Sequence, residues 1–164
     1  MKPLTVDLPY PSIKNVENNR QISALIYPLY SGGEGELNAV LQYVYHGFYF
    51  NKESEKEIKD LLESIAIAEM IHLNILGELL MRLGSNPAYY NTRTADFYSA
   101  SSVSYTHTPK RMILDDIAGE IKAVKSYSDV ILAVGDSDVS AILTRIKMDE
   151  ELHILALKNM LEKM

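Results

Sequence analysis

Two glutamates are each followed three residues later by a histidine in this chain of 164 residues. The first pair is in Glu69-Met70-Ile71-His72 and the second in Glu150-Glu151-Leu152-His153. Residues three apart lie on the same face of a helix, so each pair presents a carboxylate and an imidazole side by side. Iron and manganese both bind these two groups. The two pairs therefore predict a metal site between two helices.

A longer repeat precedes each pair. The stretches Gly35–Tyr43 and Gly119–Tyr127 both read G-E-[LI]-x-A-V-x-x-Y, and each contributes one more glutamate, Glu36 and Glu120. Four carboxylates and two imidazoles in a duplicated order are typical of a two-metal site inside a helical bundle. A single E-x-x-H pair can easily arise by chance. Two copies, each preceded by the same repeat with its own glutamate, are much harder to obtain by chance.

The duplicated order also assigns a role to each predicted ligand. The glutamates of the E-x-x-H pairs are expected to bridge two metals, and the other two glutamates to bind one metal each. Each histidine is expected to bind one metal. Two iron or two manganese ions would suit this set of ligands equally well. The coordination positions that the six side chains leave open on the metals would be available to hydrogen peroxide or dioxygen. The predicted ligands are Glu36, Glu69, His72, Glu120, Glu150 and His153.

Four further residues are expected to support the ligands through hydrogen bonds. Tyr43 and Tyr127 close the two repeats, two helical turns after the repeat glutamates and on the same face. They are expected to donate to ligand carboxylates or to act as redox-active tyrosines, and packing in the core is the alternative.

Asp149 is expected to bond the free imidazole nitrogen of His72, and Asp116 is a second inward candidate. For both residues the alternative is a position on the solvent-exposed face of the helix. In the other half of the duplication, Ala68 takes the place of Asp149, so the two metals need not be equivalent. His46 is expected on the flank of its helix.

Periodicity and end signals predict an extended arm over residues 1–20 and a bundle over 21–164. The first helix is expected to be broken at Pro28 and Ser31-Gly32-Gly33 and to run cleanly over 34–50. Three further helices are expected over 54–83, 109–135 and from 136 almost to the last residue. Counted from the two short turns, the four glutamates lie about 15–17 residues away, which places them at one level of the bundle.

A long polar connection over 85–107 joins the second and third of these helices, whereas short turns join the first to the second and the third to the fourth. That order predicts an all-α, ferritin-like four-helix bundle with one long crossover between the second and third helices.

Composition excludes several classes of protein. The net charge is −6 with no basic stripe, so no nucleic-acid partner is expected, and the absence of cysteine excludes disulfides and thiolate metal sites. No uninterrupted apolar run reaches the roughly eighteen residues of a membrane span, so no membrane partner is expected. Without the apolar core of a signal peptide near Met1, a cytoplasmic location is expected.

The combined motif resembles the ligand set of the ferritin-like dimetal-carboxylate superfamily over about residues 20–163. Tyr43 is similar to a rubrerythrin tyrosine, and Asp149-Glu150-Glu151-x-His153 is similar to both rubrerythrin and bacterioferritin. The stretch 10–37 is similar to manganese catalases and related spore-coat proteins. Rubrerythrins usually carry an extra glutamate where this chain has Ala123. Met70 occupies the position of a bacterioferritin haem ligand, but we expect it to pack in the core without haem.

The resemblance implies a non-haem di-iron or di-manganese carboxylate oxidoreductase that acts on hydrogen peroxide or dioxygen. Peroxidase, catalase and ferroxidase activities all remain open, with an external electron donor and a homo-oligomer, a dimer being favoured. The alternatives are an iron storage or sequestration protein and a metal-stabilised structural component similar to spore-coat proteins. Peroxide consumption and the mass of the oligomer would separate these functions.

Overall fold

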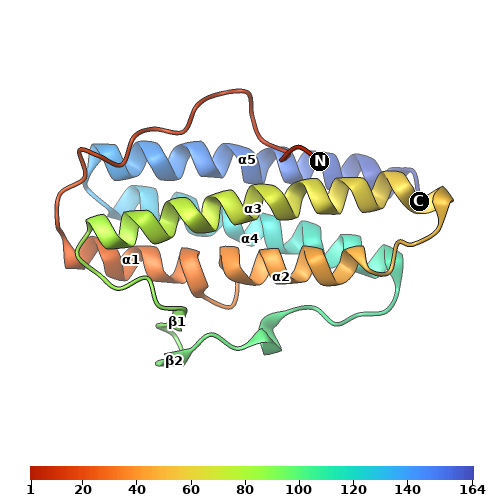
Figure 1. The fold of residues 1–164 in the computed structure, drawn as a ribbon, viewed down its shortest axis with the longest axis horizontal. Coiled ribbons are helices and arrows are strands. Elements are labelled where there is room, and N and C mark those ends of the chain that lie inside the picture. The colour runs from red at the N-terminus through yellow and green to blue at the C-terminus, as the bar shows by residue number, and fades with distance from the viewer.

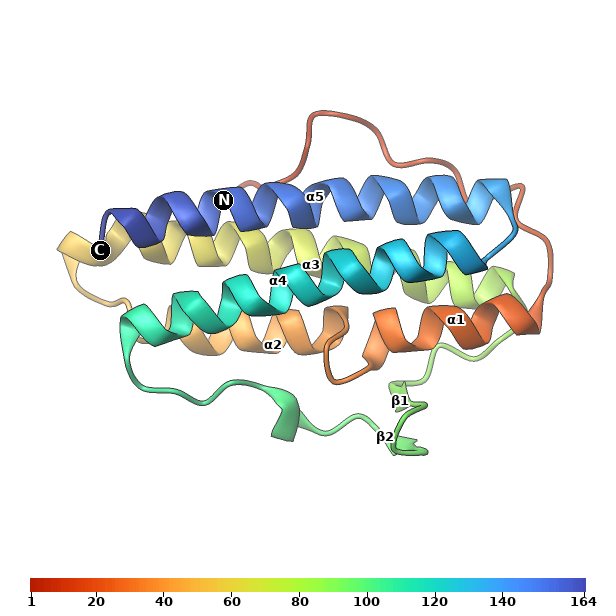
Figure 2. The ribbon, with the colours of Figure 1, turned by 180° about the vertical axis from the view of Figure 1, so that it is seen from behind.

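The computed structural model describes all 164 residues, and five α-helices dominate it (Figure 1). Helices α1 and α2 lie nearly end to end and together take one position of a four-helix bundle, and the other helices fill the remaining three (Figure 2). The predicted all-α ferritin-like bundle with one long crossover is confirmed. The helices are α1 (Arg20–Ser31), α2 (Glu36–Gly47), α3 (Lys56–Arg82), α4 (Pro109–Ala133) and α5 (Ser137–Glu162).

The break between α1 and α2 falls where the proline and the glycines predicted it. The Gly32 N–H donates to Pro28 O at 3.2 Å and closes α1, and Gly35 is the N-cap of α2. A Cβ at Gly35 would lie 2.5 Å from Leu29 O, so only glycine fits this close approach of backbone. The break makes Glu36 the first residue of α2.

Helix α2 ends at Gly47, earlier than the expected residue 50. Beyond it, the backbone N–H groups of Phe48, Tyr49 and Phe50 donate to carbonyls three residues back. The helical chain therefore tightens in its last turn rather than stopping abruptly. The 3-10 turn η1 (Glu53–Glu55) then leads into α3.

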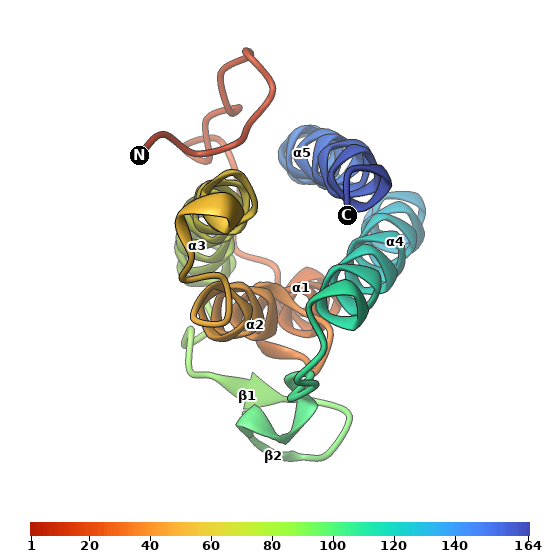
Figure 3. The same cartoon turned by 90° about the vertical axis from the view of Figure 1, so that its right-hand side faces the viewer.

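The crossover from α3 to α4 contains small elements that periodicity did not predict. The strands β1 (Tyr90–Asn91) and β2 (Asp96–Phe97) form an antiparallel pair, and the 3-10 turn η2 (Ala100–Ser102) follows. The hydroxyl of Tyr30 donates to Pro87 O at 3.0 Å and ties the start of the crossover to α1. The segment therefore runs along the side of the bundle formed by α1 and α2 (Figures 1 and 3).

The core consists of two apolar clusters on either side of one polar level. On α3, Ala66 belongs to one cluster and Leu76 to the other, and on α5 the corresponding residues are Leu157 and Ile146. Between these residues stand the E-x-x-H pairs of the two helices. The predicted ligands are therefore enclosed by apolar packing above and below.

Residues 1–19 form an arm without helix or strand that runs along α3 and α5 (Figures 1 and 3). These two helices contact each other much less than α4 contacts α5 or α2 contacts α3. The arm bonds to both helices, because Leu4 N–H donates to Ser64 O at 3.0 Å and Arg145 Nε donates to Leu8 O at 3.0 Å. It thus bridges the loosest seam of the bundle.

The segment Glu53–Arg82 is long and apolar enough to cross a membrane by length and composition alone, which corrects the expectation that the chain has no apolar segment of that length. Half of its apolar window is buried inside the protein. Its inward face also carries Glu69 and His72, both buried. These are the features of a core helix in a bundle.

Two glycines at equivalent positions of the sequence repeat test the helix break. Gly35→Ala should lower the free energy of unfolding by about 1–3 kcal/mol, because the new methyl group meets backbone at the break. Gly119→Ala is the matched control: nothing lies within 4 Å of its Cβ position inside α4, so alanine should raise stability by about 0.5–1 kcal/mol. Urea unfolding followed by circular dichroism measures both, and equal effects would contradict the role of the close approach.

Candidate metal centre

The structure brings all six predicted ligand residues together. They form two groups, and within each group one ligand atom from every residue lies within 4.8 Å of the others. The groups share Glu69 and Glu150, which is the arrangement expected of two bridging carboxylates. None of the six is more than 4% exposed. The groups are Glu36, Glu69, His72 and Glu150, and Glu69, Glu120, Glu150 and His153.

The two histidines turn the same ring nitrogen toward the shared glutamates. His72 Nδ1 lies 3.0 Å from Glu69 Oε2 and 3.1 Å from Glu150 Oε1. His153 Nδ1 lies 3.0 Å from Glu69 Oε1 and 3.2 Å from Glu150 Oε2. The rings themselves stack with centroids 6.0 Å apart. Both imidazoles are therefore oriented as ligands of the same centre.

This donor set fits two divalent cations. Glu69 Oε1 and Glu150 Oε1 are buried and make no hydrogen bond of good geometry, although a histidine Nδ1 lies 3.0 Å from the first and 3.1 Å from the second. A buried carboxylate normally has every oxygen bonded. Four buried carboxylates would each cost several kcal/mol unless positive charge compensated them. Two divalent cations supply four positive charges, and oxygen and imidazole ligands suit iron and manganese.

Without metal, protons take the place of the cations. Burial raises the pKa of Glu36 well above its usual value, and the charges of Glu150 and Glu69 raise it further. The pKa of Glu120 is raised well above normal by burial and by the same two charges. Burial also opposes ionisation of Glu69, but the facing histidines outweigh it and hold its pKa well below the usual value. Burial lowers the pKa of both histidines, yet the carboxylates outweigh burial and raise it well above normal.

The two repeat tyrosines each reach the glutamate of the other repeat. The Tyr43 hydroxyl on α2 donates to Glu120 Oε1 on α4, and the Tyr127 hydroxyl on α4 donates to Glu36 Oε1 on α2. Burial, and then the charge of the accepting glutamate, raises the pKa of each tyrosine well above its usual value. Both tyrosines therefore stay protonated donors that hold the outer glutamates across the bundle.

The outer nitrogens of the two histidines have different partners. His72 Nε2 donates to Asp149 Oδ2 at 3.1 Å, which is the hydrogen bond expected from the sequence. His153 Nε2 donates to the backbone oxygen of Leu4 at 2.8 Å, which the sequence did not predict. A carboxylate behind an imidazole makes it a stronger donor to metal than a neutral carbonyl does. The two halves of the centre are thus inequivalent.

Asp149 is itself held by the N-terminal arm. Its Oδ1 accepts from Val6 N–H at 2.7 Å, its Oδ2 accepts from the Tyr10 hydroxyl at 2.6 Å, and Arg145 Nη1 pairs with Oδ1 at 2.7 Å. Burial opposes ionisation, but the bonds from His72, Tyr10, Val6 and Arg145 together lower the pKa of Asp149 to about 2. The arm and α5 therefore keep an ionised carboxylate behind His72.

Asp116 lies on the inward face of α4 as expected, but it contacts no ligand histidine. Its Oδ1 lies 2.8 Å from both His46 Nδ1 and Gln42 Nε2. The prediction that His46 lies on the flank of its helix was wrong, because the side chain is fully buried. Burial is tolerated because Asp116 and the Ser104 carbonyl, at 2.9 Å from Nε2, satisfy both ring nitrogens.

Met70 does not pack in the core. It is 46% exposed on the outer side of α3, which corrects the expectation from its apolar surroundings in the sequence. Its neighbour Glu69 points inward, so the two residues lie on opposite faces of the helix.

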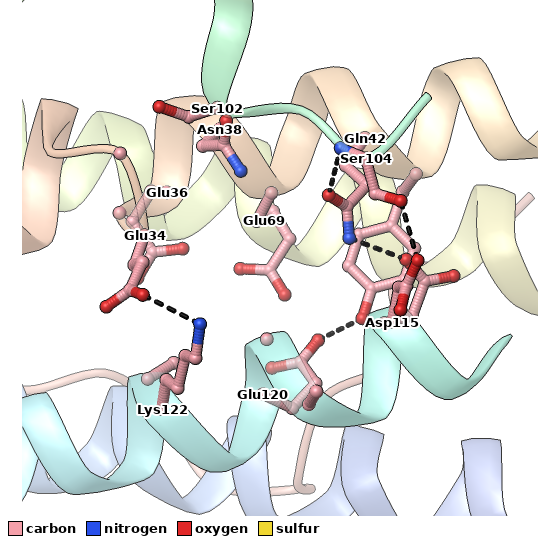
Figure 4. A pocket seen from close by; sticks show the side chains of 18 of the residues that line it. Glu34, Glu36, Asn38, Gln42, Glu69, Ser102, Ser104, Asp115, Glu120 and Lys122 are labelled. Carbon is pink, nitrogen blue, oxygen red and sulfur yellow. Dashed lines mark hydrogen bonds and ion pairs between the residues drawn. The ribbon is translucent and has the colours of Figure 1, made fainter. Parts of the chain in front are cut away.

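A cavity of about 540 Å³ leads from the centre to the surface between α2 and α4, beneath the crossover (Figure 4). Its inner wall includes Glu36, Glu69 and Glu120. At its mouth, Lys122 Nζ donates to Glu34 Oε1 at 2.8 Å, and both side chains are partly exposed. The route is polar and suits a small hydrophilic molecule.

The fold and the buried carboxylate–histidine centre define a class of protein. A family model described as Ferritin-like matches residues 29–129, which is more than half of the chain, and the chain belongs to this ferritin-like family.

Among the proteins to which the chain is similar are some described as manganese catalases. A Clostridium acetobutylicum protein described as "Probable manganese catalase" is 23% identical over 171 residues, which cover 92% of this chain and 75% of that protein. Two crystal structures of KatB, a manganese catalase from Anabaena, match with a TM-score of 0.85 and 23% identity. The match covers 96% of this chain and 78% of KatB, and at this identity it shows the shared fold.

Metal uptake should release protons. Because the pKa values of Glu36, Glu120 and both histidines are raised, binding of two Mn(II) ions near neutral pH should displace about two to four protons. Affinity should accordingly fall as the pH is lowered. Calorimetric titrations in buffers of different ionisation heat measure the proton count, and uptake without proton release would contradict the assignment.

Removal of the arm should loosen the metals. Deleting residues 1–10 removes the Leu4 carbonyl behind His153 and the Val6 and Tyr10 bonds to Asp149, so a chelator should extract metal about tenfold faster or more. Deletion of residues 1–3, which precede these contacts, is the matched control. Identical extraction rates for the two truncated proteins would show that the arm does not support the centre.

Proposed function

We propose that this chain is a non-haem dimetal oxidoreductase of the manganese catalase type, which converts two hydrogen peroxide molecules into dioxygen and two water molecules. The observation that carries the proposal is the pair of buried ligand groups that share Glu69 and Glu150 at the end of a polar cavity. Two metals held by common carboxylates can accept and return two electrons as a unit, which is the number that peroxide exchanges.

Manganese is the metal that we propose. The ligand set suits iron equally well, so the choice rests on the manganese catalases among the relatives. Disproportionation also needs no external reductant, because one peroxide supplies the electrons that the other consumes. A peroxidase would need a separate electron donor.

The residues of the chain have distinct tasks in this reaction. When bound, the metal pair would supply Lewis acidity and the capacity to exchange two electrons. Glu36 and Glu120 would hold the outer side of each metal, and the hydroxyls of Tyr43 and Tyr127 fix these carboxylates in place. The two apolar clusters exclude bulk water from the ligands except through the cavity.

The histidines would complete one shell each and give the two metals different surroundings. Behind His72 stands an ionised carboxylate, and behind His153 a neutral carbonyl. The more basic imidazole would stabilise a more positive charge on the cation that it holds, so the two positions would differ in their electrostatics.

Glu69→Ala should abolish binding of both metals and the evolution of oxygen from peroxide, because Glu69 belongs to both ligand groups. Glu78→Ala on the same helix is the matched control, since Glu78 is exposed and bonds only to Asn74. Metal analysis by mass spectrometry and an oxygen electrode give the two readouts. Loss of only one metal would show that Glu69 does not bridge.

The same measurements decide among the other functions. A natively purified protein that carries two manganese ions and evolves oxygen supports the proposal. A metal-loaded protein that leaves peroxide unchanged would overturn it in favour of a structural component. A shell of 12 or 24 subunits with stored iron would instead indicate an iron storage protein.

A further inference from the structure

His46 of α2 and Asp116 of α4 form a buried pair that the proposed metal site does not use. They are 0% and 1% exposed, and His46 Nδ1 lies 2.8 Å from Asp116 Oδ1. Gln42 Nε2 donates to the same oxygen at 2.8 Å, while Gln42 Oε1 accepts from Ser104 N–H at 2.9 Å. The Ser104 bond fixes the orientation of the amide, so its NH₂ group must face Asp116.

Both ring nitrogens of His46 face oxygen atoms that accept hydrogen bonds. Nδ1 faces Asp116, and Nε2 lies 2.9 Å from the carbonyl oxygen of Ser104. A neutral imidazole has a single N–H and cannot satisfy an ionised carboxylate and a carbonyl together. An imidazolium beside a carboxylate, which donates from both ring nitrogens, satisfies both acceptors.

The second oxygen of Asp116 is free. Oδ2 is buried without a hydrogen-bond partner, and an unsatisfied buried acceptor costs about 1–3 kcal/mol. Asp116 is also among the residues that line the cavity, together with Tyr43 and Glu120. A small donor that reached Oδ2 from the cavity, such as water or hydrogen peroxide, would satisfy it.

We propose that Asp116, supported by His46, is the base that takes a proton from hydrogen peroxide in the cavity and later returns it to the departing water. This inference rests on the proposed function. Oxidation of one peroxide to dioxygen breaks two O–H bonds, which would leave two electrons with the metal pair and one proton with Asp116, while the other proton passes through the cavity to bulk water. Reduction of the second peroxide breaks the O–O bond and consumes those two electrons, the proton from Asp116 and one proton from bulk water to give two waters.

The surroundings of the pair keep Asp116 available as a base. Burial raises its pKa above the usual value and Asp115 adds to the rise, whereas the bonds from His46 and Gln42 oppose it. Burial lowers the pKa of His46, but Asp116, the Ser104 carbonyl and Asp115 outweigh it and raise the value. The charged or titratable groups that also line the cavity include Tyr43 on α2, Glu69 on α3, and Arg111, Asp115 and Glu120 on α4.

The central experiment compares Asp116→Asn with Asp129→Asn in manganese-loaded protein. Asp116→Asn keeps the shape of the side chain and should retain both metals, but it should lower kcat for oxygen evolution by about 100-fold or more. It should also remove the loss of activity at low pH that protonation of Asp116 causes. Asp129→Asn is the control, because Asp129 lies on the exposed side of α4, pairs only with Lys125 and should leave kcat unchanged.

A second variant separates proton transfer from anchoring of the crossover. His46→Gln removes the positive charge beside Asp116, so the pKa of Asp116 should rise and the acid limb of the pH–rate profile should move to higher pH. Loss of a purely structural contact would lower activity without moving that limb. Nitrogen NMR of protein loaded with diamagnetic Zn(II) gives a readout independent of turnover: His46 should be doubly protonated at neutral pH, and neutral in Asp116→Asn.

The outcomes are distinct. If wild-type protein evolves oxygen and Asp116→Asn retains both kcat and the acid limb with full metal content, Asp116 is not the base and the proposed function stands. If His46 is neutral in the wild-type protein, the imidazolium is absent and the inference fails. If metal-loaded wild-type protein does not consume peroxide at all, the proposed function and this inference fall together.

Discussion

The enclosure of four carboxylates and two histidines at one level of the bundle is the constraint on which the rest of the structure depends. So much negative charge away from water is tolerated only with compensating cations or protons. The apolar clusters on both sides make this level rigid, and the break before Glu36 places the first carboxylate on it. The hydroxyls of Tyr43 and Tyr127 then donate hydrogen bonds to the carboxylates of Glu120 and Glu36. Each of these features positions or stabilises carboxylates whose burial would otherwise destabilise the folded protein.

The duplicated sequence produces a centre that is symmetric near the ligands and asymmetric around them. Tyr43 on α2 donates to Glu120 on α4, and Tyr127 on α4 donates to Glu36 on α2, in a nearly two-fold arrangement. Outside them the symmetry ends, since Asp149 supports one histidine and a backbone carbonyl supports the other. On the cavity side, Asp116 contributes a free oxygen that the repeat does not duplicate, because Gly32 takes its place in the other half. The duplicated helices thus hold a ligand cluster whose two halves have different surroundings.

Much of the fold and of the ligand cluster followed from the sequence, because helix ends and E-x-x-H spacing are local properties that a single chain displays directly. The N-terminal contacts could not be predicted, since Leu4 and Val6 act through backbone atoms that every residue type possesses. His46 was misplaced for a related reason: only the packing of α2 against α4 reveals the partners that make its burial acceptable. The small β pair of the crossover is held by contacts with α1 and has no periodic signature.

The contact between Leu4 and His153 joins residues 149 positions apart, and it sets an order for maturation of the protein. On the ribosome, the arm and α2, α3 and α4 all emerge before α5, which carries the second E-x-x-H pair. Until α5 packs, neither ligand group is complete and the arm has no docking site on Asp149. A site for two cations is therefore complete only once the last helix has packed against the other helices.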